Sequence, residues 1–196
     1  MRILMTGAHG MLGSYLLPEL LKDGHQVTAL VHRTPPSHDG ITLIYGDVTL
    51  PRFALEAPSP AVDAIVHCAG VISFRDSPTL HLTNVVAVQY AMNLCLELGV
   101  PLIHISTAYV CGDAAGVFGP DDLNVWQKHR NAYEKSKFTA ECIIRSEPEL
   151  TYTVIRPSIL MGDSKIAGIP PMSGLYVAMR ACYLGKRWLE RKAGLP

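Results

Sequence analysis

The chain begins with a short apolar run that leads directly into a glycine-rich turn. Residues 2–6 read RILMT, and residues 7–13 read GAHGMLG. A strand that opens a helix through G-x-x-G-x-x-G leaves the first N–H groups of that helix unpaired and directed at one point, where a pyrophosphate can accept them. Gly7 permits the tight turn, Gly10 lets the backbone approach the phosphates, and Gly13 lets the helix pack closely on the strand. The alternative is a strand–helix turn without a ligand.

The length and charge of the chain limit what it can be. Its 196 residues suit one α/β domain and are too few for a second full one. The 17 basic and 17 acidic side chains balance, so no net field attracts nucleic acid or an acidic membrane. No apolar run reaches the roughly 18 residues needed to cross a bilayer, and the five scattered cysteines fit reduced thiols. We therefore expect a cytoplasmic protein that binds neither nucleic acid nor membrane.

Short apolar runs recur along the chain, with longer amphipathic stretches between them. This alternation predicts an α/β fold, a Rossmann-type doubly wound parallel sheet of about six strands with helices on both faces. The expected strands are Arg2–Thr6, Gln26–Val31, Ile41–Tyr45, Ala64–His67, Leu102–Ser106 and Tyr152–Arg156. The expected helices are Met11–Lys22, a short one near Phe53–Glu56, Pro78–Leu98, Lys128–Ser146 and Ser173–Arg191.

The second expected strand is followed by His32 and Arg33. An acidic residue at this point of a dinucleotide site binds a ribose 2′-hydroxyl, whereas an arginine pairs with a 2′-phosphate. Arg33 therefore favours NADP(H) over NAD(H). The alternative is that Arg33 is a solvated loop residue without a ligand.

Tyr133 and Lys137 lie four residues apart in an expected helix, so their side chains share one face. The hydroxyl of an isolated tyrosine has a pKa of about 10. A neighbouring ammonium and the positive charge of an oxidised nicotinamide both favour the ionised form and lower that pKa. Tyr133 is thus a candidate general acid toward a carbonyl, or general base toward an alcohol. A lone Y-x-x-x-K pattern also occurs on ordinary helix surfaces.

Two hydroxyl residues, Ser106 and Thr107, stand at the carboxyl end of the fifth expected strand. Open α/β sheets bind their ligands at this edge. A hydroxyl there is able to hydrogen-bond the substrate oxygen while Tyr133 exchanges the proton. No metal site is expected, because the eight histidines are scattered and form no Cys/His cluster with zinc-ligand spacing.

Taken in order, these motifs resemble the extended branch of the short-chain dehydrogenase/reductase superfamily, which includes NAD-dependent epimerases and dehydratases. The resemblance covers nearly the whole chain. It is carried by T-G-x-x-G-x-x-G at 6–13, Asp47-Val48, HCAG at 67–70, Asn84, the stretch 106–112, Y-x-x-x-K at 133–137 and RPS at 156–158. Residues 105–110 look most like fatty-acyl and thioester reductases, and hydroxysteroid-type members share them loosely.

The resemblance implies roles for individual residues. Asp47 would sit by the adenine, Lys137 would bind the nicotinamide ribose, and Asn84 would hold a helix bend or a proton-relay water. The alternative for Asn84 is an ordinary position on a helix surface. The implied catalytic residues are Thr107, with Ser106 its neighbour, Tyr133, Lys137 and Asn84. The implied cofactor-binding residues are Gly7, His9, Gly10, Met11, Leu12, Gly13, Arg33, Asp47, Val48, Cys68, Ala69, Gly70, Tyr133, Lys137, Pro157, Ser158 and Ile159. The implied cofactor is NADP, with NAD as the alternative.

Extended members usually carry a carboxy-terminal substrate domain, so we expect residues 1–196 to form an NAD(P)-binding Rossmann domain whose substrate domain is truncated. The leading hypothesis is an NADP(H)-dependent oxidoreductase that moves a hydride to or from a carbonyl or alcohol carbon of a small molecule, with Tyr133 as general acid/base. One alternative is an NAD(P)-dependent epimerase or dehydratase acting on a nucleotide-sugar. Another is a non-catalytic dinucleotide-binding module. The sequence leaves a homo-oligomer open.

Overall fold

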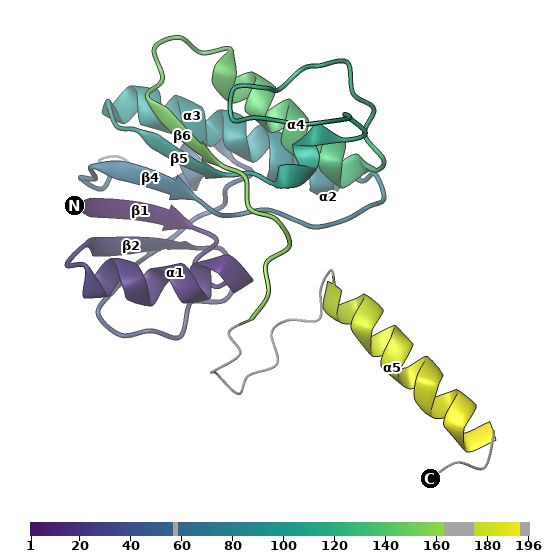
Figure 1. The fold of residues 1–196 in the computed structure, drawn as a ribbon. Coiled ribbons are helices and arrows are strands. Elements are labelled where there is room, and N and C mark those ends of the chain that lie inside the picture. Colours follow the sequence, from purple (N-terminus) through teal and green to yellow (C-terminus); the bar gives the residue numbers. More distant parts are fainter. Residues whose placement is uncertain (57–58, 163–174, 193–196) are drawn as a thin grey trace. The chain divides into compact units, whose positions relative to one another are not determined.

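A computed structural model describes residues 1–56, 59–162 and 175–192 of the chain (Figure 1). Six strands form one sheet in the order β3-β2-β1-β4-β5-β6, and every neighbouring pair is parallel. The strands are β1 (Arg2–Thr6), β2 (Gln26–Val31), β3 (Thr42–Tyr45), β4 (Ala64–His67), β5 (Leu102–Ile105) and β6 (Tyr152–Ile155). The predicted α/β fold with a parallel sheet is confirmed.

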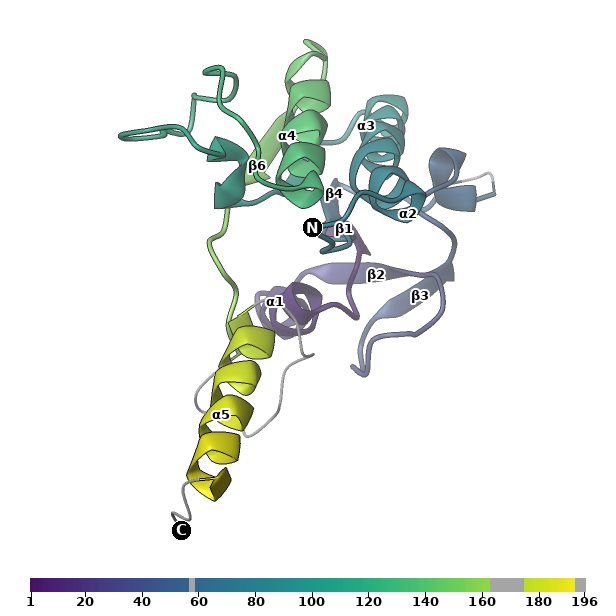
Figure 2. The ribbon, with the colours of Figure 1, turned by 90° about the vertical axis from the view of Figure 1, so that its right-hand side faces the viewer.

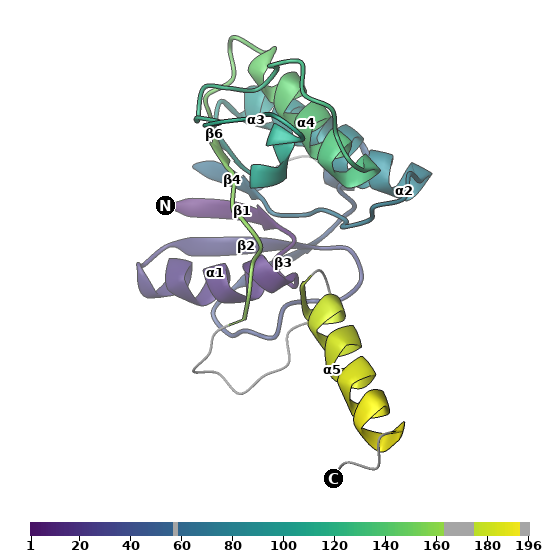
Figure 3. The ribbon, with the colours of Figure 1, turned by 45° about the vertical axis from the view of Figure 1, so that its right-hand side comes forward.

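Helices from residues 1–158 cover both faces of this sheet, and one further helix, α5, belongs to a separate unit described below. The helices are α1 (Met11–Lys22), α2 (Pro78–His81), α3 (Ala87–Leu98), α4 (Ala132–Arg145) and α5 (Leu175–Lys192), with the short turns η1 (Pro51–Ala54), η2 (Leu82–Val86) and η3 (Ala108–Cys111). α3 and α4 lie side by side over one face (Figures 2 and 3), whereas α1 packs on the other. This two-sided cover is what a doubly wound sheet requires.

Side chains alternate along the central strands between two hydrophobic cores. On β1, Leu4 packs into the core beneath α3 and α4, together with Val88 of α3. Its neighbours Ile3 and Met5 face the other core, with Leu17 of α1. This period of two is the geometry of an extended strand, and it buries β1 on both faces.

The chain divides into two compact units, Met1–Ser158 and Ile159–Pro196. The first contains the sheet and the helices α1 to α4. The second contains α5, where the Tyr176 hydroxyl accepts a hydrogen bond from the Gly162 N–H at 2.7 Å. Large apolar side chains of α5 are exposed, namely Met179, Tyr183, Leu184, Trp188 and Leu189. Within the described residues, no helix combines the length and apolar character needed to cross a membrane.

The expected bounds of β1, β2, β4 and α1 are confirmed, and several others differ. Three strands are one residue shorter than expected. β3 begins after Ile41, β5 ends before Ser106 and β6 ends before Arg156. The helix expected over Ser173–Arg191 is observed as α5, and Ser173 lies outside the described residues.

Two expected helices have a different local form. The helix expected over Pro78–Leu98 is α2, η2 and α3 in succession, because η2 is a π-type turn. The prediction of a short helix near Phe53–Glu56 is wrong. The chain there forms the turn η1, in which Arg52, Phe53 and Ala54 have φ values of 52°, 59° and 57°. This left-handed turn places Phe53 fully inside the core.

The helix expected over Lys128–Ser146 begins later, at Ala132. Asn131 caps it, since its side chain accepts the Glu134 N–H at 2.9 Å and donates to Glu134 Oε1 at 3.0 Å. This reciprocal pair resembles a capping box, except that Glu134 accepts the side-chain amide of Asn131 and the backbone N–H of Arg130 at 2.8 Å. Lys128 therefore belongs to the long connection that precedes α4.

Candidate active site

The turn after β1 brings two stretches of backbone into close contact. Gly7 has a φ of 70°, and a Cβ on it would lie 2.6 Å from the Ala69 nitrogen. A Cβ on Gly13 would lie 2.3 Å from the Gly7 carbonyl oxygen. Only glycine fits either position without moving β1, β4 or α1.

The start of α1 presents free donors beside this turn. The Gly10 N–H donates to the Gly7 carbonyl at 2.9 Å, and the first helical bond runs from the Ser14 N–H to the Gly10 carbonyl at 2.8 Å. The N–H groups of Met11, Leu12 and Gly13 precede that bond. Backbone donors in this position are suited to an anion.

A cleft of about 640 Å³ opens at this edge of the sheet. Its lining includes these residues that the sequence analysis assigned to the cofactor: Gly7, His9, Gly10, Arg33, Asp47, Val48, Cys68, Ala69 and Gly70. Other lining residues were missed: Ala8, Leu30, Thr34, Pro36, Gly46, Thr49, Val71, Thr79, Leu82 and Thr83. The available signal was a position within five residues after the end of a strand, which holds for Ala8, Thr34, Pro36, Gly46, Thr49 and Val71. Leu30 lies within β2, and Thr79, Leu82 and Thr83 lie in α2 and η2.

Asp47 is held in place by its own turn. Its Oδ1 accepts the Thr49 N–H at 2.9 Å and the Thr49 hydroxyl at 2.7 Å, and its Oδ2 lies 3.5 Å from His32 Nε2. Burial raises the pKa of Asp47, but the hydrogen bonds from Thr49 and the charges of His32 and Arg33 outweigh it, so this pKa lies below its ordinary value. Asp47 therefore places a carboxylate in the same cleft that Arg33 lines.

Tyr133 and Thr107 come together at the carboxyl end of β5. Tyr133 is half-buried in the first turn of α4. Burial raises the pKa of Tyr133, the hydrogen bond with Thr107 lowers it and Tyr109 raises it, so the pKa lies above its ordinary value. The Thr107 oxygen accepts the Tyr109 N–H at 3.3 Å. Its hydroxyl hydrogen is therefore available to the phenol oxygen of Tyr133.

Lys137 shares a face of α4 with Tyr133, as the spacing predicts, and its side chain is directed to the end of β5. Its Nζ donates to the Ile105 carbonyl at 2.6 Å and lies 3.4 Å from His104 Nε2. The expectation that this ammonium lowers the pKa of Tyr133 stays a prediction. The ammonium is engaged beneath the end of β5, and burial has the largest effect on the phenol.

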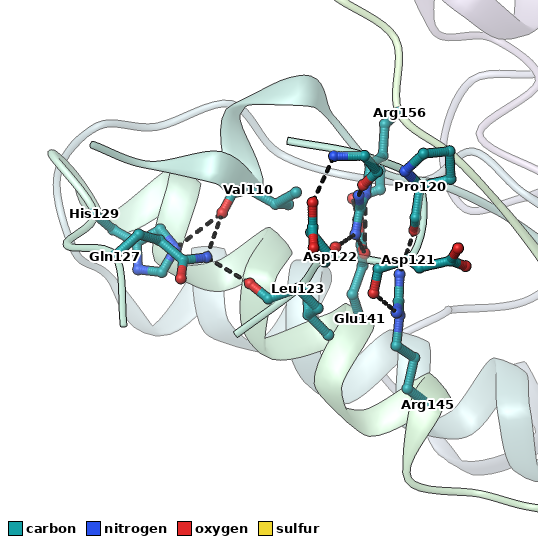
Figure 4. Close-up of polar contacts among 12 residues, drawn as sticks. Val110, Pro120, Asp121, Asp122, Leu123, Gln127, His129, Glu141, Arg145 and Arg156 are labelled. Atoms are coloured by element: carbon teal, nitrogen blue, oxygen red, sulfur yellow. Dashed lines mark hydrogen bonds and ion pairs between the residues drawn. The ribbon is translucent and has the colours of Figure 1, made fainter. Parts of the chain in front are cut away.

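Ser106 is directed away from Tyr133 and into a buried ion pair. Its hydroxyl donates to Glu141 Oε1. Glu141 is fully buried, and Arg156 Nη2 reaches its Oε2 at 2.7 Å (Figure 4). Because successive side chains of an extended segment point to opposite sides, Ser106 and Thr107 are separated although they are adjacent in sequence.

Arg156 and Arg145 also hold the connection formed by residues 112–131 (Figure 4). The Arg156 guanidinium donates to the carbonyls of Gly119 and Asp122 at 3.1 and 2.7 Å. The Arg145 guanidinium donates to the carbonyls of Pro120 and Asp121, both at 2.8 Å. This connection leads directly into α4. The two arginines therefore help to hold the chain segment that precedes Tyr133.

Asn84 connects the cleft to the helix that carries Tyr133. Its side chain accepts the Val71 N–H and donates to the Val71 carbonyl, both at 2.8 Å. It also donates to Ser136 Oγ at 3.0 Å, and that hydroxyl donates to the Tyr133 carbonyl at 2.8 Å. Asn84 thus ties the wall after β4 to the first turn of α4 through the π-type turn η2.

The segment after β6 is described only in part. The Pro157 carbonyl accepts the Ala108 N–H at 2.9 Å, which places Pro157 beside Thr107. Ser158 is the exposed last residue of the first unit. Ile159 begins the second unit and is not located relative to the cleft.

The residues at the cleft fit a dinucleotide. The glycine turn leaves the space that a Cβ would fill, the start of α1 offers unpaired N–H groups, and Arg33 adds a positive charge. Pyrophosphate, with its two negative charges, matches these donors.

The sequence pattern of the NAD dependent epimerase/dehydratase family matches residues 3–190. This chain belongs to that family. The resemblance to extended short-chain dehydrogenases/reductases is thereby confirmed.

Curated relatives of this family member are enzymes. The dTDP-6-deoxy-L-talose 4-dehydrogenase (NAD(+)) of Aggregatibacter actinomycetemcomitans is 29% identical over 177 residues, which cover 84% of this chain and 63% of the relative. The 2-alkyl-3-oxoalkanoate reductase of Stenotrophomonas maltophilia is 28% identical over 184 residues, covering 88% and 55%. The chain thus spans between 55% and 63% of the length of these two relatives.

Solved structures of the same fold include a terminal R domain and a sugar-nucleotide complex. The terminal R domain from the myxalamid PKS-NRPS biosynthetic pathway has a TM-score of 0.74 and 25% identity, over 83% of this chain and 50% of that one. MoeE5 in complex with UDP-glucuronic acid and NAD has a TM-score of 0.65 and 28% identity, over 79% and 52%.

Proposed function

We propose that this chain is the dinucleotide-binding part of a cytoplasmic NADP(H)-dependent oxidoreductase. It would transfer a hydride to or from a carbonyl or alcohol carbon of a small molecule, with Tyr133 as general acid/base. The observation that carries the proposal is the position of Tyr133 in the first turn of α4, which packs against the turn η3 that Thr107 caps at the end of β5. The adjacent strand β4 ends at the Cys68–Gly70 wall of the cleft, so a proton donor stands next to the proposed dinucleotide site.

The nicotinamide, when bound, supplies or accepts the hydride. Tyr133 donates its proton to the carbonyl oxygen during reduction, and its phenolate removes the hydroxyl proton during oxidation. Thr107 donates to the phenol oxygen, which favours the phenolate and orients the ring. Asn84 and Ser136 hold the turn of α4 from which Tyr133 projects.

Replacing Tyr133 with phenylalanine tests the chemical role. In single-turnover mixtures of NADPH with small aldehydes, ketones or thioesters, Tyr133→Phe should lower the rate of NADPH oxidation by at least about a hundredfold. The affinity for NADPH should not change, because the hydroxyl acts at the reacting oxygen. Tyr45→Phe, at an exposed position of β3, serves as the control. Equal rates for Tyr133→Phe and the wild type would remove Tyr133 from the mechanism.

Replacing Arg33 tests the preference for NADP(H). Arg33 lines the cleft next to His32, and a 2′-phosphate would pair with it. Arg33→Ala should weaken NADPH binding by about 10- to 100-fold and leave NADH binding unchanged, as measured by titration of each. The exposed Arg75→Ala is the matched control. A wild-type chain that binds NADH as tightly as NADPH would contradict the preference.

A nucleotide-sugar epimerase or dehydratase is the second candidate. It is favoured by the family itself and by the 28% identity to MoeE5, whose structures hold UDP-glucuronic acid or UDP-glucose together with NAD. Tyr133 would act in both candidates. Net release of oxidised dinucleotide during turnover supports the oxidoreductase, whereas turnover without net change of the dinucleotide supports the epimerase.

A further inference from the structure

The ammonium of Lys137 is held by one backbone and one side-chain acceptor. Its Nζ donates to the Ile105 carbonyl at 2.6 Å and lies 3.4 Å from His104 Nε2. Lys137 is 4% exposed and His104 is fully buried. Because an ammonium has only donors, His104 Nε2 must be the acceptor. With a charged Lys137, the ring proton of His104 resides on Nδ1, a buried atom that has no hydrogen-bond partner among the described residues.

His104 belongs to a row of polar side chains across three strands. Thr6, His67 and His104 are register partners on β1, β4 and β5. Thr6 Oγ1 accepts the Ala69 N–H at 3.2 Å and forms a hydrogen bond with His67 Nδ1, 2.9 Å away. The His67 and His104 rings stack with centroids 5.8 Å apart. His67 thus contacts Thr6 and stacks on the His104 ring.

The other titratable groups around Lys137 do not replace His104. Glu141, one turn further along α4, is engaged by Arg156 and Ser106. Burial raises the pKa of the Cys68 thiol to about 12, so that thiol is neutral. Burial likewise lowers the pKa of His67 to about 3. Among the described residues, His104 is the side chain whose acceptor atom contacts the Lys137 ammonium.

We propose that His104 is a positioning residue, whose Nε2 docks the Lys137 ammonium at the end of β5 and keeps it charged until the dinucleotide binds. This inference rests on the proposed function and on the role that the family resemblance implies for Lys137, which is to bind the nicotinamide ribose. Burial lowers the pKa of Lys137 from 10.5 to about 8, and Glu141 opposes that effect. Loss of the His104 acceptor removes a further stabilisation of the charged form, so Lys137 would lose its proton at a lower pH.

The pH dependence of NADPH affinity provides the first test. In the wild-type chain, affinity should decline above the pKa of Lys137. His104→Phe keeps the stacked ring but removes the acceptor, and should move this decline to lower pH by about one unit. His104→Gln retains an amide acceptor and should restore the wild-type profile. His67→Phe perturbs the same stack without contacting Lys137, and should leave the profile in place. Equal profiles for wild type and His104→Phe, or equal shifts for the two phenylalanine variants, would overturn the proposal.

The tautomer of His104 in the free chain provides a test that needs no ligand. In ¹⁵N-histidine-labelled protein at neutral pH, the His104 signals, assigned by their loss in His104→Gln, should show a protonated Nδ1 and an unprotonated Nε2. The opposite tautomer would overturn the proposal even if His104→Phe fails to fold. A chain that shows the expected tautomer but binds no NADPH would contradict the proposed function and leave the contact with Lys137 intact.

Discussion

Gly10 and Gly13 differ in what an added side chain would meet. At Gly13 a Cβ would lie 2.3 Å from the Gly7 carbonyl oxygen and 2.7 Å from the Ala8 Cα, both backbone atoms. At Gly10 the nearest atom is the Gly7 oxygen, at 3.1 Å. Gly13→Ala should therefore push α1 off β1 and lower the free energy of unfolding by about 2 kcal/mol. Gly10→Ala should lower it less and should mainly weaken NADPH binding, since its side chain enters the phosphate site.

Urea unfolding and NADPH titration of both variants measure these effects. Gly185→Ala in α5 is the control, because nothing lies within 4 Å of the Cβ position there. Unfolding midpoints that are the same for Gly13→Ala and Gly185→Ala would show that the close contact at Gly13 is not needed.

The site could be predicted from the sequence in residue type but not in side-chain direction. The helical spacing placed Tyr133 and Lys137 on one face of α4 correctly, yet that face packs on the sheet. The long Lys137 side chain therefore reaches the Ile105 carbonyl beneath it. The alternation of an extended strand explains why Ser106 faces Glu141 and Thr107 faces Tyr133. No local pattern reveals Glu141 as the partner, because 35 positions separate it from Ser106.

At the scale of elements, the start of α4 was misplaced because its cap was not recognised. The pattern Asn131-x-x-Glu134 was present in the sequence and is the signal for a helix start. The central strands were predictable because their apolar runs are short and are bounded by Gly or polar residues. The connection 112–131 was predictable only as a loop, since its shape depends on carbonyl contacts with the distant Arg145 and Arg156.

The cap of α4 gives a prediction for this element. Asn131→Ala removes the acceptor for the Glu134 N–H and the donor to its carboxylate, and should lower the free energy of unfolding by about 1 kcal/mol. Asn131→Ser keeps a capping oxygen and should recover most of that loss. Chemical denaturation of the two variants beside the wild type measures the difference. Identical losses in both would mean that the cap does not stabilise α4.

For the molecule as a whole, buried titratable groups predict how stability depends on pH. Burial lowers the pKa of His67 from 6.5 to about 3, and lowers that of His104 well below 6.5. Below pH 6.5 these two histidines therefore bind protons in the unfolded chain, whereas they stay neutral in the folded chain. Stability should be complete above this pH and should decline below it, by about 1.4 kcal/mol per pH unit for each histidine.

Two opposing effects act on the alkaline side. Burial raises the pKa values of Cys68 and Cys95 from 9.0 to about 12, so above pH 9 only the unfolded chain loses these protons and stability declines. Lys137 acts in the other direction. Its folded pKa is about 8 against an ordinary 10.5, so between these values the unfolded chain holds the extra proton and stability rises with pH.

The Lys137 effect can be isolated by comparing variants, because both cysteines are common to them. Lys137→Met removes the cost of burying a charge, so below pH 8 its free energy of unfolding should exceed that of the wild type by a constant amount. Above pH 8 the wild type sheds this cost by losing the proton, and the difference should narrow by about 1.4 kcal/mol per pH unit toward 10.5. Lys135→Met, at an exposed position of the same helix, should differ from the wild type by the same small amount throughout. Urea unfolding at intervals from pH 6 to 10 measures all three chains, and a Lys137→Met difference that stays constant across pH 8 would mean that the buried ammonium keeps its proton.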